Sequence, residues 1–210
     1  MNKKISALLL AGAMMLSLAA CGAKEAAPAP APSAPSTSTS TEATGEVAGL
    51  TAPIAEAPAL VNSGGQSADY QMIATVMGKV GMDYTVANLC TSADLGDAKT
   101  LIVVVGGSSK GLGAAGIDAD GELARLTELL DGAKSAGLTV IAMHTGGEAR
   151  RGELSDKFIT PIFEKADYAI VVTSGDEDGL MSGICASKGI PMDGIASISE
   201  VATVLPAAFK

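Results

Sequence analysis

The 210-residue sequence predicts one doubly wound α/β domain of three layers, in which helices cover both faces of a mainly parallel sheet of about five strands. Two observations indicate this class. Short apolar stretches rich in β-branched residues alternate with longer stretches whose apolar residues recur with a helical period. In addition, residues 101–105 have the sequence Leu-Ile-Val-Val-Val, and a strand that is apolar on both faces is typical of the centre of a parallel sheet.

The expected strands are short and lie between helical stretches. They cover residues 59–62, 84–86, 101–105, 138–143 and 168–172, and a short further strand follows near 190–192. This succession favours the flavodoxin-like strand order 2-1-3-4-5, with a Rossmann-like order as the alternative. We expect no second domain, which argues against a two-lobed clamshell binding protein.

Apolar residues at helical spacing predict the helices between these strands. We expect Ser67 to cap the first helix. Its apolar face is formed by Met72, Ile73, Val76, Met77 and Val80. Later helices are predicted around residues 123–133, 159–163 and 180–185, with Pro161 in a first turn or at a kink. A capping box from Ser197 to Glu200 opens the last helix, which Pro206 limits.

The first 57 residues differ from the rest in composition. Lys3 and Lys4 precede an apolar run of residues 5–20, which is shorter than the ~20 residues that span a bilayer. The run ends in Leu-Ala-Ala before Cys21, which resembles the lipobox of bacterial lipoprotein precursors; an ordinary signal peptide with a chance cysteine is the alternative. We therefore expect a signal peptide at 1–20, lipidated Cys21 with a disordered Ala/Pro/Ser/Thr tether at 21–57, and a folded domain at 58–210.

Composition and charge exclude several classes of function. The net charge of −9 disfavours nucleic acid as a partner, because a phosphate backbone is bound by an excess of basic residues. With one histidine and three cysteines, the sequence predicts neither a metal site nor a disulfide framework, and no cofactor is expected. Cys90 and Cys185 lie near opposite ends of the expected sheet, so we expect two free thiols.

The segments that follow the strands are rich in glycine and hydroxyl groups, and ligands of open α/β sheets bind at these carboxyl ends. The candidate ligand-binding residues are Ser63, Gly64, Gly65, Gln66, Ser67, Gly106, Gly107, Ser108, Ser109, Lys110, His144, Thr145, Gly146, Gly147, Arg150, Arg151 and Ser174. Lys110, Arg150 and Arg151 would attract a small anion, and amides of the glycines would donate hydrogen bonds to it. Alternatively, the two arginines are solvated or paired with Glu148 and Glu153.

Three further interpretations have weaker support. The pattern Gly111-x-Gly113-x-x-Gly116 matches a dinucleotide-binding motif, but it begins five residues beyond Gly106 and not in a strand–helix turn. A flavin site lacks an aromatic residue in the loops after the third and fourth strands. His144 could serve as a base for Ser108 or Ser109, with Asp118 or Asp176 as the orienting acid, although no nucleophile-elbow motif is present.

Two long segments, residues 101–118 and 142–156, resemble a family of bacterial lipoproteins, domain of unknown function family 6305. The resemblance extends over residues 58–210, implies an extracytoplasmic α/β domain, and supplies no catalytic residues. We therefore expect a lipoprotein on the outer face of the cytoplasmic membrane that binds a small, anionic ligand. The alternatives are an extracytoplasmic hydrolase or transferase that uses His144 and loop serines, and an accessory subunit that binds a membrane protein.

Overall fold

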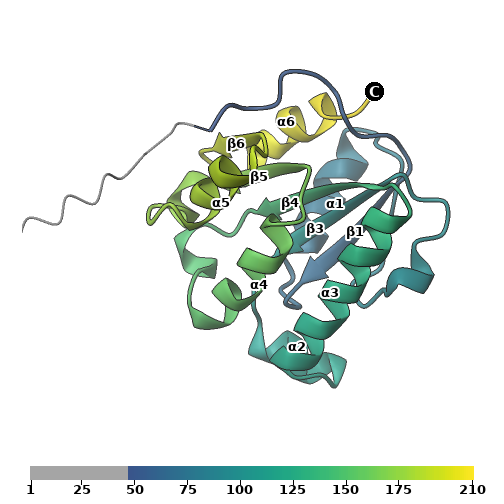
Figure 1. Cartoon of the computed structure of the whole chain (residues 1–210), viewed down its shortest axis with the longest axis vertical. Helices are drawn as coiled ribbons and strands as arrows, with labels where there is room; N and C mark the ends of the chain where they lie inside the picture. Colours follow the sequence, from purple (N-terminus) through teal and green to yellow (C-terminus); the bar gives the residue numbers. More distant parts are fainter. Residues whose placement is uncertain (1–46) are drawn as a thin grey trace, which may run out of the picture. The chain divides into compact units, whose positions relative to one another are not determined.

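The computed structural model describes residues 47–210, so the predictions on the signal peptide, on Cys21 and on most of the tether lie outside the described residues. Six parallel strands form one sheet in the order β2-β1-β3-β4-β5-β6 (Figure 1). The strands are β1 (Ala59–Gly64), β2 (Tyr84–Val86), β3 (Thr100–Val105), β4 (Thr139–His144), β5 (Tyr168–Val172) and β6 (Met192–Ile195). The α/β class and the flavodoxin-like order of the first five strands are confirmed, and β6 adds a sixth.

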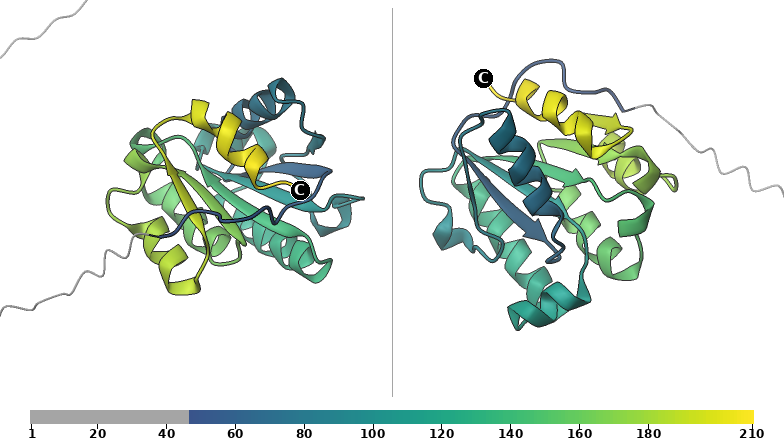
Figure 2. Two further views of the ribbon diagram at one scale, coloured as in Figure 1. Left: turned by 90° about the horizontal axis from the view of Figure 1, so that it is seen from above. Right: turned by 180° about the vertical axis from the view of Figure 1, so that it is seen from behind.

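Helices cover both faces of this sheet (Figure 2). One face packs against α1 (Asp69–Lys79) and α6 (Val201–Ala207), and the other against α3 (Ala119–Ser135), α4 (Glu153–Phe163) and α5 (Leu180–Lys188). The remaining helix is the short α2 (Ser109–Ala115), and 3-10 turns lie at η1 (Ser92–Asp94), η2 (Glu148–Arg150), η3 (Thr173–Gly175) and η4 (Ile198–Glu200). No helix among residues 47–210 is both long and apolar enough to cross a membrane.

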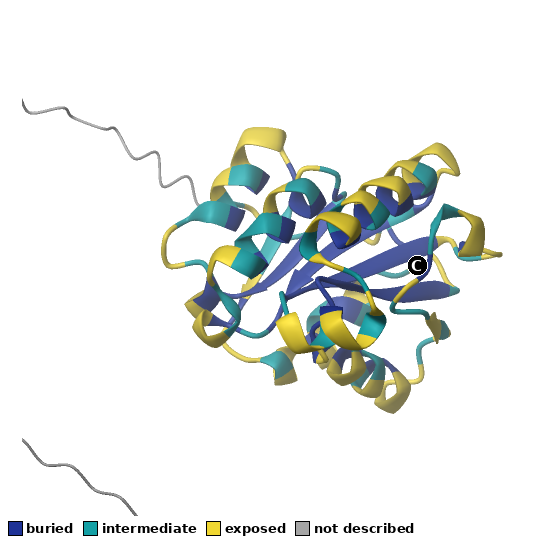
Figure 3. Cartoon of the chain, turned by 90° about the horizontal axis from the view of Figure 1, so that it is seen from below, coloured by how far each residue is buried: buried dark blue, intermediate teal, exposed yellow. Residues whose placement is uncertain are grey.

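The four middle strands β1, β3, β4 and β5 are buried almost throughout, as the apolar run in β3 predicts, whereas the edge strands β2 and β6 are partly exposed (Figure 3). Leu101 and Val103 belong to the core on the α3 side, whereas Ile102 and Val104 belong to the core on the α1 side. Because successive side chains of the strand enter apolar cores on both faces, polar side chains lie mainly at the strand ends. Cys90 and Cys185 are buried free thiols, which confirms that prediction.

Three local predictions differ from the structure. Residues 109–115, expected as loop, form α2, because the Ser108 hydroxyl accepts a hydrogen bond from Gly111 N at 3.0 Å and caps the helix. Ser67 is not the N-cap residue of α1, which is Ala68; the Ser67 hydroxyl donates to Asp69 Oδ2 at 3.0 Å and accepts from Asp69 N at 3.4 Å. Met72 is 51% exposed, because Asp69, Ile73 and Met77 form the buried stripe of α1.

The C-terminal helices also differ in detail from the prediction. Pro161 lies in the last turn of α4, and Pro206 lies inside α6. The capping box at Ser197 is not formed, because the Glu200 carboxylate accepts from Ala196 N at 3.2 Å and the segment begins as a 3-10 turn. These differences shift helix ends and leave the arrangement of the layers unchanged.

Residues 48–56, which we call the strap, cross the amino ends of the strands before β1 begins (Figures 1 and 2). Ala48 O accepts from Met192 N at the start of β6, Ile54 O accepts from the Thr139 hydroxyl at the start of β4, and Glu56 O accepts from the Thr100 hydroxyl at the start of β3. The expected tether of residues 21–57 therefore ends in a stretch that packs on the domain, and the chain enters this domain at the amino edge of the sheet.

Candidate functional site

All the candidate ligand-binding residues lie at, or just after, the carboxyl ends of β1, β3, β4 and β5. The glycines among them mainly allow the loops to pack against one another. A Cβ atom on Gly65 would lie 2.7 Å from Gly106 O, and one on Gly111 would collide with Gln66 O. Close loop packing thus accounts for the glycine content, which by itself indicates no ligand.

Arg151 is held by carboxylates and is not available to an anion. Its guanidinium donates to both oxygens of Asp178, at 2.8 and 2.7 Å, to Asp156 Oδ1 at 2.8 Å and to Gly175 O at 2.6 Å. This pairing lowers the pKa of Asp178 to about 2 and raises the pKa of Arg151, each through hydrogen bonds to the other charge. The predicted partners Glu148 and Glu153 are not involved, and Arg151 joins the η3 turn to α4.

Several other candidates do not converge on a common point. Ser109 and Lys110 are exposed in the first turn of α2, and Ser108 serves as the cap of that helix. Gln66 is bound to Asn88, with Nε2 donating to Asn88 O at 2.9 Å and Oε1 accepting from Asn88 Nδ2 at 3.1 Å. These side chains shape the edge of the sheet without facing one another.

His144 is fully buried, and each of its ring nitrogens faces a carbonyl oxygen. Nδ1 lies 3.2 Å from Val105 O and Nε2 lies 3.2 Å from Gly147 O. A neutral imidazole donates only one hydrogen bond, so one of these contacts is unfavourable until the ring is protonated. Burial opposes protonation and lowers the pKa of His144. Because neither Ser108 nor Ser109 bonds to its ring, the constellation needed for the hydrolase alternative is not assembled.

Asp69 and Arg150 form an ion pair on the α1 side of the carboxyl edge. Arg150 ends the η2 turn, where its N–H donates to Gly147 O and its side chain folds back over Gly146. Its Nε lies 3.3 Å from Asp69 Oδ2, and the Arg150 side chain is 42% exposed whereas that of Asp69 is 8% exposed. Asp69, at the start of α1, was not among the ligand-binding residues expected from the sequence. The only signal that could have indicated it is its position two residues after Ser67.

The register of the sheet places Thr145 at the same edge as this pair. Val104 and Met143 are partners in the β3–β4 ladder, so continuation of the register sets Gly106 opposite Thr145. A Cβ atom on Gly106 would lie 3.1 Å from Asp69 Oδ2, and the next residue after Thr145 contacts the Arg150 side chain. The Thr145 hydroxyl is buried and has no hydrogen-bond partner within residues 47–210. We call Ser67, Asp69, Thr145 and Arg150 the polar cradle.

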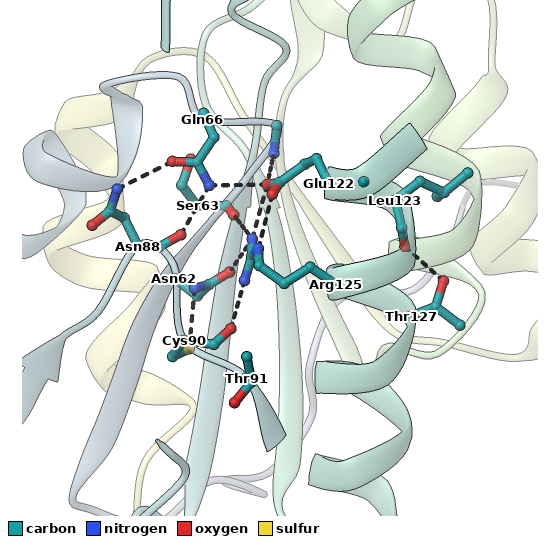
Figure 4. A network of polar contacts seen from close by, with 12 residues as sticks. Asn62, Ser63, Gln66, Asn88, Cys90, Thr91, Glu122, Leu123, Arg125 and Thr127 are labelled. Carbon is teal, nitrogen blue, oxygen red and sulfur yellow. Dashed lines mark hydrogen bonds and ion pairs between the residues drawn. The ribbon is translucent and has the colours of Figure 1, made fainter. Parts of the chain in front are cut away.

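A second polar cluster, on the α3 side of the same edge, was missed by the sequence analysis (Figure 4). The buried carboxylate of Glu122 accepts from Arg125 Nε and Nη2, both at 2.8 Å, and from Gly65 N and Gln66 Nε2, both at 3.0 Å. Arg125 also donates to the carbonyl oxygens of Cys90 and Ser63 and to Asn62 Oδ1. In sequence the pair looks like an ordinary surface pair at i and i+3 of a helix.

A shallow depression of about 530 Å³ lies at the opposite, amino edge of the sheet. It is lined by Ile54, Lys134, Gly137, Leu138, Thr139, Asp167 and Pro191. Its charged groups are already paired, because Lys134 Nζ donates to Asp167 Oδ1 at 2.5 Å and Val140 N donates to Asp167 Oδ2 at 2.8 Å. The depression thus offers a ligand no unpaired charge.

Two solved structures are distantly similar to this chain. One is the psychrotrophic esterase EstA from Pseudoalteromonas sp., in a structure inhibited by monoethylphosphonate, with a TM-score of 0.31 and 12% identity over 69% of this chain and 81% of that chain. Another is TesA, with a TM-score of 0.30 and 13% identity over 64% and 77%. No curated protein matches the sequence. The model of one family, domain of unknown function (DUF6305), matches residues 56–209, and the chain therefore belongs to that family.

Proposed function

We propose that this protein is a lipid-anchored, extracytoplasmic binding protein that holds a small polar ligand in the polar cradle. The observation that carries the proposal is the half-exposed Asp69–Arg150 pair at the carboxyl edge of the sheet, where the buried Thr145 hydroxyl also has no partner within residues 47–210. Leaving a buried hydroxyl unpaired costs about 1–3 kcal/mol, so such groups are rare in a folded domain unless something else satisfies them. A ligand that reached Thr145 through an opening of this edge would recover that free energy on binding.

The position of the cradle supports binding at this edge. Ligands of open parallel sheets bind beyond the carboxyl ends of the strands, and Thr145 directly follows the central strand β4. The strap brings the preceding chain to the amino ends of the strands, at the other edge of the sheet. A tether that begins at Cys21 would then leave the domain on the side away from the cradle, so that the cradle would remain open to solutes.

Binding is favoured over catalysis by the state of the nucleophile and base candidates. His144 is enclosed between two carbonyl oxygens, and the Ser108 hydroxyl is used as a helix cap. The cradle itself contains no imidazole or thiol. Its groups can donate and accept hydrogen bonds, which suits recognition of a ligand.

Thermal unfolding of the purified full chain, in the presence of sugars, amino acids, phosphates and carboxylates in turn, tests the binding proposal. We expect at least one compound to raise the melting temperature, and both Thr145→Val and Arg150→Ala to remove that rise. Lys110→Ala, which removes an exposed charge of the same edge outside the cradle, is the matched control and should retain it. A rise that survives both cradle substitutions, or no rise with any compound, contradicts the proposal.

The anchor is tested separately by expression of the chain in bacteria supplied with an alkyne-tagged fatty acid. We expect the label on the full chain and its recovery with membranes, and expect neither for Cys21→Ser. An unlabelled chain that is secreted with a cleaved leader would instead support the ordinary signal peptide.

A further inference from the structure

We infer that β2 pairs with β2 of a second copy of this chain in antiparallel orientation, so that the two parallel sheets join into one. The inference concerns an outer edge of the sheet and does not depend on the polar cradle. It follows from the backbone groups and side chains of β2 that have no partner within residues 47–210.

The two outer edges of the sheet differ in how they are covered. At the β6 edge, Ala48 O in the strap accepts from Met192 N at 3.1 Å. Leu50 N in the same strap donates to the Asp193 carboxylate at 3.2 Å. At the β2 edge, β1 is the one strand of residues 47–210 that pairs with β2. An uncovered edge strand presents backbone groups to which another strand can bond.

The hydrogen bonds between β2 and β1 identify the free backbone groups. Asp83 O and Ala87 N, on either side of β2, both bond to β1 at 3.0 Å. Residues that alternate along a strand direct their N–H and C=O groups to the same side, so Thr85 also faces β1, whereas Tyr84 and Val86 face away from it. Within residues 47–210, the N–H and C=O groups of Tyr84 and Val86 make no hydrogen bond.

This set of backbone groups is complementary to itself. If a two-fold axis passes between the Thr85 residues of two copies, Tyr84 of each copy lies opposite Val86 of the other. Two residues that face each other in this way across antiparallel strands exchange both of their hydrogen bonds. A single register therefore satisfies all the outward backbone groups of both strands, which is the requirement for a symmetric interface between identical chains.

The side chains of β2 favour the same register. Tyr84 packs on the core of the α1 side, and Val86, two residues later, shares that face and is 44% exposed. The pairing places a tyrosine ring beside each exposed valine. On the other face, the exposed Thr85 meets Thr85 of the second copy. Aromatic residues beside β-branched residues, and threonine beside threonine, are favourable pairs across antiparallel strands.

The charges near β2 do not oppose this pairing, although the chain as a whole carries a net charge of −9. Asp83, the acidic residue next to β2, lies opposite Ala87 of the second copy and not opposite another acid. The paired strands are short, however, and their contact alone is smaller than the interface of a stable dimer in solution. We therefore expect a dimer that is weak in dilute solution and forms where copies of the chain are concentrated.

Disulfide trapping tests the register, because the Cα atoms of the two Thr85 residues would be about 4.5 Å apart, close enough for a disulfide. Bacteria that express the full chain are oxidised mildly, and covalent dimer is measured on a non-reducing gel. Asp83→Cys is the matched control, since its equivalents would lie about 14 Å apart. We expect Thr85→Cys to give at least about tenfold more dimer than Asp83→Cys. The wild type gives the background from the native cysteines.

Val86→Pro, added to Thr85→Cys, tests whether the backbone of β2 forms the contact. Proline removes the outward N–H and leaves the bonds to β1 in place, so the dimer yield should fall to that of Asp83→Cys. Val86→Thr, which keeps the N–H and a branched side chain, should retain the yield. If Val86→Pro also lowers the melting temperature, the comparison of Thr85→Cys with Asp83→Cys decides by itself.

Three results would overturn the inference. The first is an equal yield of dimer from Thr85→Cys and Asp83→Cys. The second is a yield that Val86→Pro leaves unchanged in a protein that keeps its melting temperature. The third is a covalent product whose mass is not twice that of the chain, because a different protein would then occupy the edge of β2.

Discussion

Two carboxylate–guanidinium pairs lie at the same edge of the sheet, on opposite faces, and they differ in what surrounds them. Glu122 and Arg125, on the α3 side, are nearly enclosed, and every oxygen and nitrogen of the pair has a partner (Figure 4). Asp69 and Arg150, on the α1 side, form one longer contact, and the buried Thr145 hydroxyl at the same edge has no partner within residues 47–210. The first pair fixes the loop after β1 to a helix, whereas the second has unused capacity to bind something else.

This difference follows from the cost of burying polar groups. A buried charge is tolerated when hydrogen bonds replace its hydration, which Glu122 obtains from two backbone or amide donors in addition to Arg125. The cradle keeps Arg150 partly in solvent and leaves Thr145 unsatisfied, so it adds little to the stability of the free protein. A polar cluster that stabilises little and retains hydrogen-bonding capacity is the better candidate for a ligand site.

Of the substitutions that test this comparison, Glu122→Ala should cause the largest loss in the free energy of unfolding. It leaves the Arg125 guanidinium buried without its carboxylate, and loss of one member of a buried pair costs about 3–5 kcal/mol. Urea unfolding should show that loss. Glu128→Ala on the same helix, which removes an exposed carboxylate bonded to Ser92, is the control and should cost under about 0.5 kcal/mol. Equal effects of the two substitutions would remove the basis for assigning the Glu122 cluster a structural role.

Arg151→Ala should have an intermediate effect. The side chain is 15% exposed and links Asp156, Asp178 and Gly175, so its removal should lower the free energy of unfolding by about 1–2 kcal/mol. Arg150→Ala, which breaks only the half-exposed pair to Asp69, should cost under about 1 kcal/mol. Chemical unfolding of the two variants compares an arginine that links two elements with one that we propose binds a ligand. The assignments would be reversed if Arg150→Ala proved the more destabilising.

The fold was largely predictable from the sequence, whereas the cradle was not. The strand at residues 101–105 and the alternation of strands and helices depend on local patterns, so the class and the strand order followed from them. Asp69 meets Arg150 across 81 positions, and no local pattern indicates that pair. The glycines at the strand ends pointed to the edge where the cradle lies, although in the structure they mainly let the loops pack against one another.

A smaller effect is expected from the titration of His144, the only histidine of the sequence. Burial lowers its pKa in the folded protein below the unfolded value of about 6.5. The unfolded chain therefore binds the proton more readily, and stability should fall as the pH drops below about 6.5, until the folded pKa is reached. Urea unfolding between pH 7 and about 5.5 should show this slope in the wild type and not in His144→Gln. If stability depended on pH in the same way in the wild type and in His144→Gln, the pH dependence could not be assigned to His144.

The smallest change in stability, and the one with the most informative sign, is expected for Thr145→Val. Valine has nearly the same shape but no hydroxyl, so the substitution removes a buried group without a partner and should stabilise the free protein by up to about 1 kcal/mol. Thr100, at the start of the neighbouring strand β3, is the control, because it is also buried and its hydroxyl both donates to Glu56 O and accepts from Glu56 N. Thr100→Val should therefore destabilise by about 1–2 kcal/mol. The two substitutions should therefore change the free energy of unfolding in opposite directions when urea unfolding is measured without ligand. That result would show that the Thr100 hydroxyl stabilises the fold and that the Thr145 hydroxyl does not. If Thr145→Val makes the protein more stable and also abolishes ligand binding, the hydroxyl is kept for function. Selection retains a destabilising group only where that group serves binding.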